Sequence, residues 1–552
     1  MPSDLDRRFD DILAWATGPD GRLEIGQDET GQAIVTNFPG TLPDFFAAFC
    51  ALNAEAEAVV AGNERLTFAE IQEISDRLAK ALVRRGIAKG DRVAIAMRNC
   101  PAWIVGYMGI VKAGGIATLL NGWWEGHEMA HAIGLTDPRL ILADPPRAAR
   151  IAARCMDRDV VSLPIDQPVE QAIAELLRDE DGATELPEIS PDDDATILFT
   201  SGSTGDAKGA VSTHRAVTTG TYAYATGLIV LKGLLESEGR PPPTPRTLLS
   251  VPLFHVTGEV PVMLNSFVVS RCMVIMPKWD ATEALRLIEK EGITYFVGVP
   301  TMSLELLNHP HRDKYDLSSL TDITAGGAPR PITHVERLKT EFPKAQPALG
   351  YGLTETNATG CSNFWGNYAA KPASTGRAQR PFVEVGILGD GDAKMDVGEI
   401  GEIGIRTAAN VRGYWNNPDA TAELFTADGY VRTGDVGYLD EDGYLFIVDR
   451  KKEIIIRGGE NISAAEVEAA CYACEAVAEA SVFGAADERL GEVPVAVIHA
   501  RTPVSEHELR AFLEDRLARF KVPERIIFST ESLPRLGTGK IDRRALKALH
   551  AH

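Results

Sequence analysis

The most constraining feature of this sequence is the repeated alternation of capped helices with apolar strands. Thr67 and Glu70 form a capping box ahead of a helical apolar stripe that Gly86 ends, and an apolar strand follows at 92–97. The same order returns some two hundred residues later, where a capped helix leads into a strand at 293–299. Alternation over such a length predicts an α/β fold with parallel or mixed sheets flanked by helices.

The pattern changes after Asp449. The rest of the chain holds one capped amphipathic helix and two candidate strands, at 478–483 and 525–528, which is enough for a small core of its own. We therefore expect a large N-terminal α/β domain over residues 1–448 and a small, mobile α+β domain over residues 449–552.

Charge excludes several classes of partner. Lys and Arg number 56 and Asp and Glu 78, so the net charge is −22. An acidic surface repels nucleic acids and anionic membranes unless a local basic patch offsets it. We expect no nucleic-acid partner, and we expect any polyanionic ligand to be small and held by a concentrated local site.

Neither a membrane span nor a disulfide framework is expected. The most apolar stretch, 103–120, is interrupted by Lys112, so it is interpreted as buried core, and residues 1–11 lack the apolar run of a signal peptide. Seven scattered cysteines include one close pair, Cys471 and Cys474, with no further ligands for zinc. These features predict a cytoplasmic protein with packed thiols.

An amphipathic helix is expected at 3–16, with Leu5, Phe9 and Leu13 on one face. The sequence allows this face to pack against the body of the protein or against a partner subunit. A homodimer is therefore one of two arrangements, and the role of the helix stays open.

A candidate phosphate site follows the short strand that ends at Phe199. Glycines let backbone N–H groups turn inward, and hydroxyls with one lysine add donors, so such a loop can wrap phosphate oxygens. It is not a Walker A loop, because Ala207 stands where that motif has glycine before its lysine. The alternative is a flexible hydroxyl-rich turn. The candidate donors are Thr200, Ser201, Gly202, Ser203, Thr204, Gly205 and Lys208.

The loop resembles the phosphate loop of the adenylate-forming superfamily, which includes acyl- and aryl-CoA synthetases, peptide-synthetase adenylation domains and firefly-type luciferases. The family usually has proline at Ala207, a change that removes no donor. Further motifs that resemble those of the family follow in the family's order. They lie at residues 326–329, 350–356, 433–435, 449–450 and 533–543.

The resemblance implies a role for each matching residue. Gly327, Ala328 and Pro329 would border adenine and the acyl pocket, and Tyr351, flanked by Gly350 and Gly352, would stack on adenine. On the phosphate and ribose side, Thr354 would touch the α-phosphate, Glu355 would hold magnesium, Asp435 would accept from the ribose hydroxyls and Arg450 would lie nearby.

The implied chemistry explains the residue types. A carboxylate is a poor electrophile until its oxygen attacks the α-phosphorus of ATP and AMP becomes its leaving group. Loop amides, Lys208, magnesium at Glu355 and the ammonium of Lys540 would offset the repulsion between the two anions. The resemblance therefore implies an acid–thiol ligase that uses ATP, Mg²⁺ and coenzyme A.

Transfer to a thiol requires a different face of the site. By the resemblance, the small domain would pivot at Asp449, withdraw Lys540 and bring Gly458 and Gly459 beside the narrow pantetheine chain. No carrier domain follows Lys540 before the chain ends, which favours free coenzyme A over a carrier protein.

The segment 251–258 resembles the acyl-site motif of fatty- and aryl-acid ligases. His255 stands where amino-acid-activating relatives have aspartate, and it either lines the carboxylate end of the acyl channel or is a packed structural residue. Tyr351 replaces the tryptophan of acetate-type enzymes, so a larger acid is expected, with fatty acids ahead of aryl acids. A carrier-protein loader and a non-catalytic acyl-AMP-binding paralogue are the alternatives.

Overall fold

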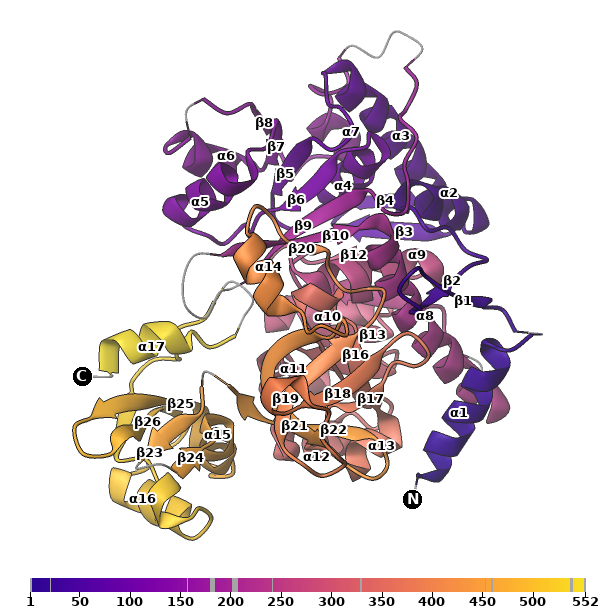
Figure 1. Ribbon diagram of the computed structural model, residues 1–552. Helices are drawn as coiled ribbons and strands as arrows, with labels where there is room; N and C mark the ends of the chain where they lie inside the picture. The colour runs from indigo at the N-terminus through magenta and orange to yellow at the C-terminus, as the bar shows by residue number, and fades with distance from the viewer. Residues whose placement is uncertain are drawn as a thin grey trace.

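We analysed a computed structural model of the chain (Figure 1). The structure describes residues 2–19, 21–155, 157–178, 184–200, 207–240, 242–327, 330–451, 453–457, 460–536 and 540–550. Within them the expected α/β fold is confirmed, with two mixed sheets in the large N-terminal part and a separate sheet near the C-terminus.

The first mixed sheet is built mainly from parallel strands. The β5–β6, β5–β7, β6–β9 and β7–β8 pairs are parallel, whereas β10 runs antiparallel to both β9 and β20. In spatial order the strands are β20 (Gly413–Tyr414), β10 (Lys208–Thr213), β9 (Asp194–Thr200), β6 (Ile116–Leu119), β5 (Arg92–Ala96), β7 (Leu140–Ala143) and β8 (Val160–Ser162).

The second sheet has more strands than the first, and its strand pairing changes from parallel to antiparallel at β15. From β3 to β15 neighbouring strands run parallel, and from β15 to β18 they run antiparallel. In spatial order the strands are β18 (Glu384–Leu388), β19 (Gly401–Arg406), β21 (Val431–Leu439), β22 (Tyr444–Arg450), β17 (Gly376–Ala378), β16 (Gly360–Phe364), β15 (Gln346–Gly352), β14 (Asp322–Gly326), β13 (Tyr295–Gly298), β11 (Arg246–Leu249), β12 (Cys272–Ile275), β3 (Glu57–Ala61) and β4 (Glu64–Thr67).

The helices begin and end where the local signals predict. Helix α3 (Phe68–Arg84) begins at the Thr67–Glu70 capping box, and α10 (Ala281–Glu291) ends at Gly292, which adopts a left-handed conformation with φ of 63°. Helix α4 (Pro101–Lys112) is buried along its whole length, as expected for core. Among the described residues, no helix is both long enough and apolar enough to cross a bilayer.

The remaining helices of the large part cover the two sheets. They are α2 (Leu42–Leu52), α5 (Gly126–Thr136), α6 (Pro145–Ala152), α7 (Val169–Ala172), α8 (His214–Ser237), α9 (Asn265–Val268), α11 (Pro300–Asn308), α12 (Ile332–Glu341), α13 (Trp365–Ala370) and α14 (Pro418–Leu424). A π-helix, η1 (Gly258–Leu264), precedes α9, and a short 3-10 helix, η3 (Thr354–Thr356), follows β15.

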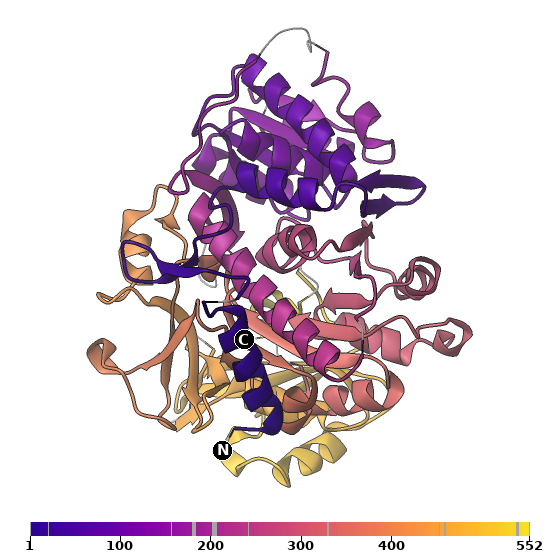
Figure 2. The same ribbon diagram turned by 90° about the vertical axis from the view of Figure 1, so that its right-hand side faces the viewer.

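Helix α1 (Asp4–Ala16) packs against the body of the protein, which decides between the two arrangements that the sequence left open for its apolar face. Leu13 is buried with Val230 and Leu234 of α8, and Figure 2 shows the indigo helix lying along the long magenta helix. Asp6 accepts hydrogen bonds from Tyr444 at 2.9 Å and Arg377 at 3.1 Å, so polar contacts also hold the helix to the second sheet.

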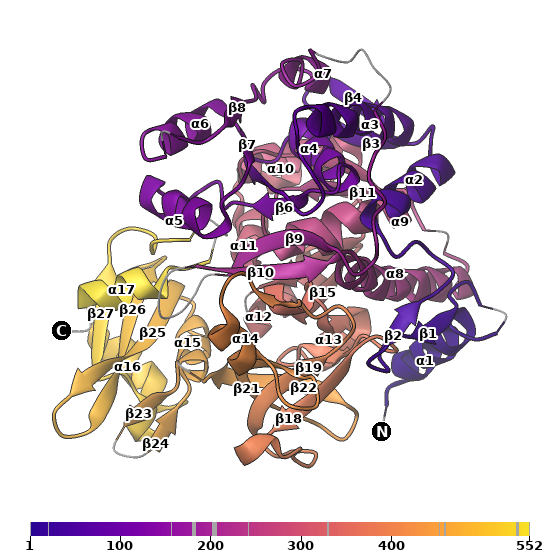
Figure 3. The same cartoon turned by 45° about the horizontal axis from the view of Figure 1, so that its top comes forward.

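The C-terminal part has its own sheet and core. Strand β26 (Gly491–Ala500) pairs with β25 (Val477–Asp487), β27 (Arg525–Ser529) and β23 (Ile455–Arg457), and β23 pairs with β24 (Glu460–Ile462), so the two expected strands are present. Helices α15 (Ala464–Tyr472), α16 (Glu506–Glu514) and α17 (Arg543–His550) complete this part. Figure 3 shows it, in yellow, to one side of the large part.

Cys471 is buried on α15, and Cys474 lies just beyond the helix; the thiols of both are free, as the sequence predicts for packed residues.

Candidate active site

One side of the site is a buried carboxylate held by two donors. Asp435 on β21 is only 5% exposed; its Oδ2 accepts from the Tyr351 hydroxyl at 2.7 Å, and its Oδ1 lies 3.1 Å from Nε of Arg450. The ladder between β21 and β22 sets Asp435 opposite Arg450. Burial raises the pKa of Asp435, and the charge of Arg450 opposes that rise. Carboxylate oxygens have lone pairs to spare, so Asp435 can also accept from a vicinal diol.

Tyr351 is presented by a sharply folded segment. It is the second-last residue of β15, and burial raises its pKa well above the ordinary value, so the phenol remains a donor to Asp435. A Cβ added to Gly352 would lie 1.9 Å from the carbonyl oxygen of Ala358. Glycine is therefore required at this position for the chain to return beneath Tyr351.

A second group gathers around Glu355 on η3, the residue that follows Thr354. The hydroxyl of Tyr414 donates to Glu355 Oε1 at 2.7 Å, and Nζ of Lys208 lies 4.9 Å from the centroid of the Tyr414 ring. Lys208 pairs with Thr200 at the loop end of the β9–β10 hairpin, so these two phosphate-loop residues lie opposite one another. Burial raises the pKa of Tyr414, which keeps it a donor.

The residues present fit a magnesium ion that is completed by its substrate. Within the described ranges, no cluster of three or more His, Cys, Asp or Glu side chains is arranged to hold a metal. Oε2 of Glu355 accepts no hydrogen bond from any described residue, so it can face a cation. Mg²⁺ commonly binds through one or two carboxylates together with substrate phosphates and water.

Lys540 reaches this site from the small C-terminal part. A Cβ placed on Gly327 would lie 3.1 Å from Cε and 3.3 Å from Nζ of Lys540, so the ammonium passes directly over that glycine. Burial lowers the pKa of Lys540 to about 8, and the positive charge of Arg450 adds to this effect, whereas Asp435 and Glu453 oppose it. The lysine is therefore cationic at neutral pH but close to its titration.

His255 lies in the same electrostatic environment. Its Nδ1 accepts the backbone N–H of Thr257 at 3.2 Å, which leaves the proton of the neutral ring on Nε2. Burial, together with the positive charge of Lys540, lowers the pKa of His255 to about 3. His255 is thus a neutral donor beside Lys540, which favours the channel position over a purely structural one.

The structure brings together residues from all six motifs that the sequence singled out, and it adds Tyr414. No motif signalled this tyrosine, because it lies 59 residues beyond Glu355 and meets it only when β20 pairs with β10. Several predicted residues lie outside the described residues. They are Ser201, Gly202, Ser203, Thr204, Gly205, Ala328, Pro329, Gly458 and Gly459.

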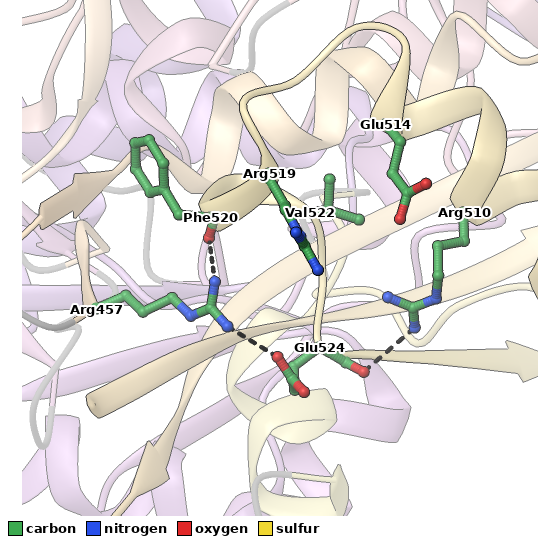
Figure 4. Close-up of a pocket in the computed structure, with 7 residues that line it drawn as sticks. All are labelled: Arg457, Arg510, Glu514, Arg519, Phe520, Val522 and Glu524. Carbon is green, nitrogen blue, oxygen red and sulfur yellow. Dashed lines mark hydrogen bonds and ion pairs between the residues drawn. The ribbon is translucent and has the colours of Figure 1, made fainter. Parts of the chain in front are cut away.

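A cavity of about 530 Å³ lies elsewhere, in the C-terminal part (Figure 4). Arg457, Arg510 and Arg519 line it together with Glu524, and Arg457 already donates to Glu524 at 2.9 Å and to the carbonyl of Phe520 at 2.8 Å. Its walls hold none of the nucleotide-motif residues, so it is separate from the site around Asp435.

Comparison with known proteins gives a consistent result. Residues 46–415 match the family model of the AMP-binding enzyme, and residues 466–540 match that of the AMP-binding enzyme C-terminal domain. The chain is 33% identical to a long-chain-fatty-acid–CoA ligase of Bacillus subtilis over 94% of each chain. It is 34% identical to a feruloyl-CoA synthase of an Amycolatopsis species, over 89% of this chain and 95% of the relative.

Comparison with solved structures agrees with the family models and the relatives. The o-succinylbenzoate CoA synthetase of Bacillus subtilis, in complex with its acyl-adenylate intermediate, superposes with a TM-score of 0.78 at 28% identity and covers 92% of this chain and 98% of its own. Sequence motifs, site geometry and both comparisons lead to one conclusion: the chain belongs to the AMP-binding enzyme family of the adenylate-forming superfamily, and it is an acid–thiol ligase.

Proposed function

We propose that this protein activates a carboxylic acid, with a fatty acid ahead of an aryl acid, and passes the acyl group to coenzyme A. In the first step a carboxylate oxygen attacks the α-phosphorus of ATP, an acyl-AMP forms and pyrophosphate leaves. In the second step the thiol attacks the acyl carbon, the thioester forms and AMP leaves. The observation that carries the proposal is the convergence of Lys540 with Asp435 and Arg450 over Gly327.

Each described residue has a part in this scheme. Asp435 holds the ribose hydroxyls, and Tyr351, which also bonds Asp435, offers its ring to adenine. Lys208 and Thr200 lie at the phosphate end, where Thr354 reaches the α-phosphate. Magnesium, when bound, neutralises phosphate charge and draws electrons from the α-phosphorus.

Lys540 and His255 act at the reacting carboxylate. The ammonium of Lys540 offsets the negative charge that develops as pyrophosphate leaves. His255 Nε2–H can donate to an acid oxygen, and since its ring is neutral it adds no second cation beside Lys540. For thioester formation the small domain, which we place at 449–552, pivots about Asp449 and withdraws Lys540.

The acid preference is supported by the relatives, which are named for long-chain fatty acids and for ferulate. Tyr351–Gly352, in the place of a pocket-closing tryptophan, is consistent with acids larger than acetate. We further propose a cytoplasmic location, tested by fractionation. The apolar face of α1 is already buried within the chain, so it does not indicate a dimer interface. Light scattering would measure whether the enzyme is a homodimer.

ATP–pyrophosphate exchange over a panel of carboxylic acids tests the proposal. We expect exchange with medium- to long-chain fatty acids and weaker exchange with aryl acids; no exchange with any acid would leave only a non-catalytic acyl-AMP-binding protein. Coenzyme A or an acyl carrier protein is then added to the active pair. Thioester formation on the carrier alone would replace the ligase with a carrier loader.

A further inference from the structure

Arg330, just before α12, is a buried cation that has no counter-ion among the described residues. The residue is 5% exposed, and among the residues that the structure describes none forms a hydrogen bond with its Nε, Nη1 or Nη2. Its Cζ lies 6.0 Å from the ring centroid of Tyr368 on α13. Burial lowers the pKa of Arg330, and Tyr368, not a carboxylate, is the group that offsets this. An unpaired buried charge of this kind is strongly unfavourable.

Two more buried polar atoms near Arg330 lack partners. The hydroxyl of Tyr368, a fully buried residue, and Nδ1 of His334 on α12 form no hydrogen bond within the described chain. All three groups can act as donors: the guanidinium offers five N–H bonds in a planar fork, and the phenol and the imidazole offer one each. Buried donors without acceptors indicate that an acceptor-rich species is missing from this place.

The surroundings of His334 are strongly positive. Burial, together with the charges of Arg330, Arg337 and Arg501, lowers its pKa to about 4. Arg337 is already committed to Glu341, with 2.7 Å between Nε and Oε1. Arg501 is exposed, directly follows β26 and approaches from the small C-terminal part. The cations therefore gather where the two parts of the molecule meet.

This concentration of positive charge is unusual in a chain whose net charge is −22. A fork of guanidinium donors with a phenol beside it matches the oxygens of a phosphate group, which accept several hydrogen bonds at once. We propose that Arg330, Tyr368 and His334 form a binding site for a phosphate-type oxyanion, which Arg501 of the small domain closes.

Two sources could supply such a group: inorganic pyrophosphate or phosphate in solution, and the phosphate groups of coenzyme A. The site does not include Asp435, Glu355 or Lys540, and the inference does not depend on the proposed function. Because one cation comes from the small domain, a bound anion would favour the arrangement of the two parts described here.

Binding to the full-length protein tests the proposal by calorimetry in magnesium-free, low-salt buffer. Saturating α,β-methylene ATP fills the nucleotide site, and pyrophosphate is titrated. We expect one further binding event, weakened at least about tenfold by Arg330→Met because charge-assisted hydrogen bonds are lost. The matched control is Arg337→Met, whose guanidinium is paired with Glu341, and it should change affinity by less than about twofold.

Thermal unfolding provides a readout that does not need activity. In anion-free buffer Arg330→Met should raise the melting temperature, because it removes an uncompensated buried charge. With the nucleotide site filled by α,β-methylene ATP, pyrophosphate should raise the melting temperature of the wild type and of Arg337→Met, but not that of Arg330→Met. Equal stabilisation of all three proteins by pyrophosphate would overturn the proposal.

A second set of titrations distinguishes free pyrophosphate or phosphate from the phosphate groups of coenzyme A. If pyrophosphate and phosphate leave the wild type unchanged, coenzyme A and its 3′-dephospho form are titrated instead. Binding of coenzyme A that weakens in Arg330→Met and not in Arg337→Met assigns the site to its phosphate groups. No Arg330-dependent binding with any of these probes would refute the site. Loss of ATP–pyrophosphate exchange, by contrast, would refute only the proposed function.

Discussion

Asp435 and Lys540 face the same site, yet the chain holds them in different ways. Asp435 lies within a ladder of the second sheet, and both of its oxygens are engaged, by Tyr351 and Arg450. Lys540 belongs to the small C-terminal part, and its side chain approaches Gly327 of the large part. We therefore propose that the ribose side is built in advance, whereas the lysine side is delivered.

The segments that flank Lys540 support this difference. Arg543 donates to Glu468 at 2.7 Å, and Arg535 pairs with Glu479, so the lysine segment is tied to the body of the small domain. We propose that it moves with that domain and not with the sheet that holds Asp435. A delivered cation can serve one half-reaction and leave for the next, while a fixed acceptor serves both.

The largest expected effect is that of Lys540→Ala. Loss of the ammonium should slow acyl-AMP formation by roughly tenfold to several hundredfold, since a charge-assisted contact contributes about 1.5–3 kcal/mol. Thioester formation from supplied acyl-AMP should be retained. Separate single-turnover assays of the two half-reactions measure this, with the exposed Lys547→Ala on α17 as the control. An equal loss of rate in both half-reactions would contradict the distinction between a fixed ribose side and a delivered lysine.

Asp435→Asn tests the fixed side. The amide cannot accept from both ribose hydroxyls and also from Tyr351, so KM for ATP should rise roughly 10- to 100-fold. Both half-reactions use the adenosine group, and both should weaken. Initial rates are measured at varied ATP and at varied acyl-AMP. The control is Asp440→Asn, because Asp440 pairs with Lys371 away from the site. A defect confined to adenylation would mean that Asp435 acts with Lys540.

The pKa of Lys540, about 8, predicts a pH dependence that the fixed side lacks. The side chain is cationic below this value and loses its proton as pH rises through it, so kcat/KM for adenylation should fall about tenfold per pH unit above 8. Lys540→Arg keeps its charge and should abolish this decline while lowering the rate overall. An unchanged alkaline limb in that variant would assign the titration to another group.

The smallest effect is expected for Tyr414→Phe. Removing the hydroxyl that donates to Glu355 should raise the magnesium concentration needed for half-maximal adenylation by roughly 2- to 10-fold, as for one neutral-donor hydrogen bond. The maximal rate at saturating magnesium should remain close to that of the wild type. Tyr438→Phe, whose ring stacks on Phe446, serves as the control. A fall in the maximal rate alone would show that Tyr414 supports the phosphates and not the metal.

Much of the architecture could be predicted from local patterns. The capping box at Thr67, the terminating Gly292 and the buried stretch 103–120 each occur as expected, because caps and apolar periodicity act over a few residues. The sequence could not predict the packing of α1 on α8, since an apolar helix face does not indicate which surface it packs against.

Within the site, linear motifs predicted the ribose, metal and lysine residues in order. They could not reveal Tyr414 beside Glu355, nor His255 as a neutral donor next to Lys540, because each pair meets across long separations in the chain. Arg330 carried no signal at all, since a buried arginine and an exposed one look the same in a sequence.

By itself, the sequence determined the α/β class, the family and the residue types needed for acid activation, since these depend on short-range periodicity and on motif chemistry. Only the tertiary structure decided which carboxylate faces which donor, what charge surrounds Lys540 and where a guanidinium is left unpaired. Burial and electrostatic coupling depend on distances in space, and spatial proximity arises only when strands distant in sequence pair and the sheets pack together.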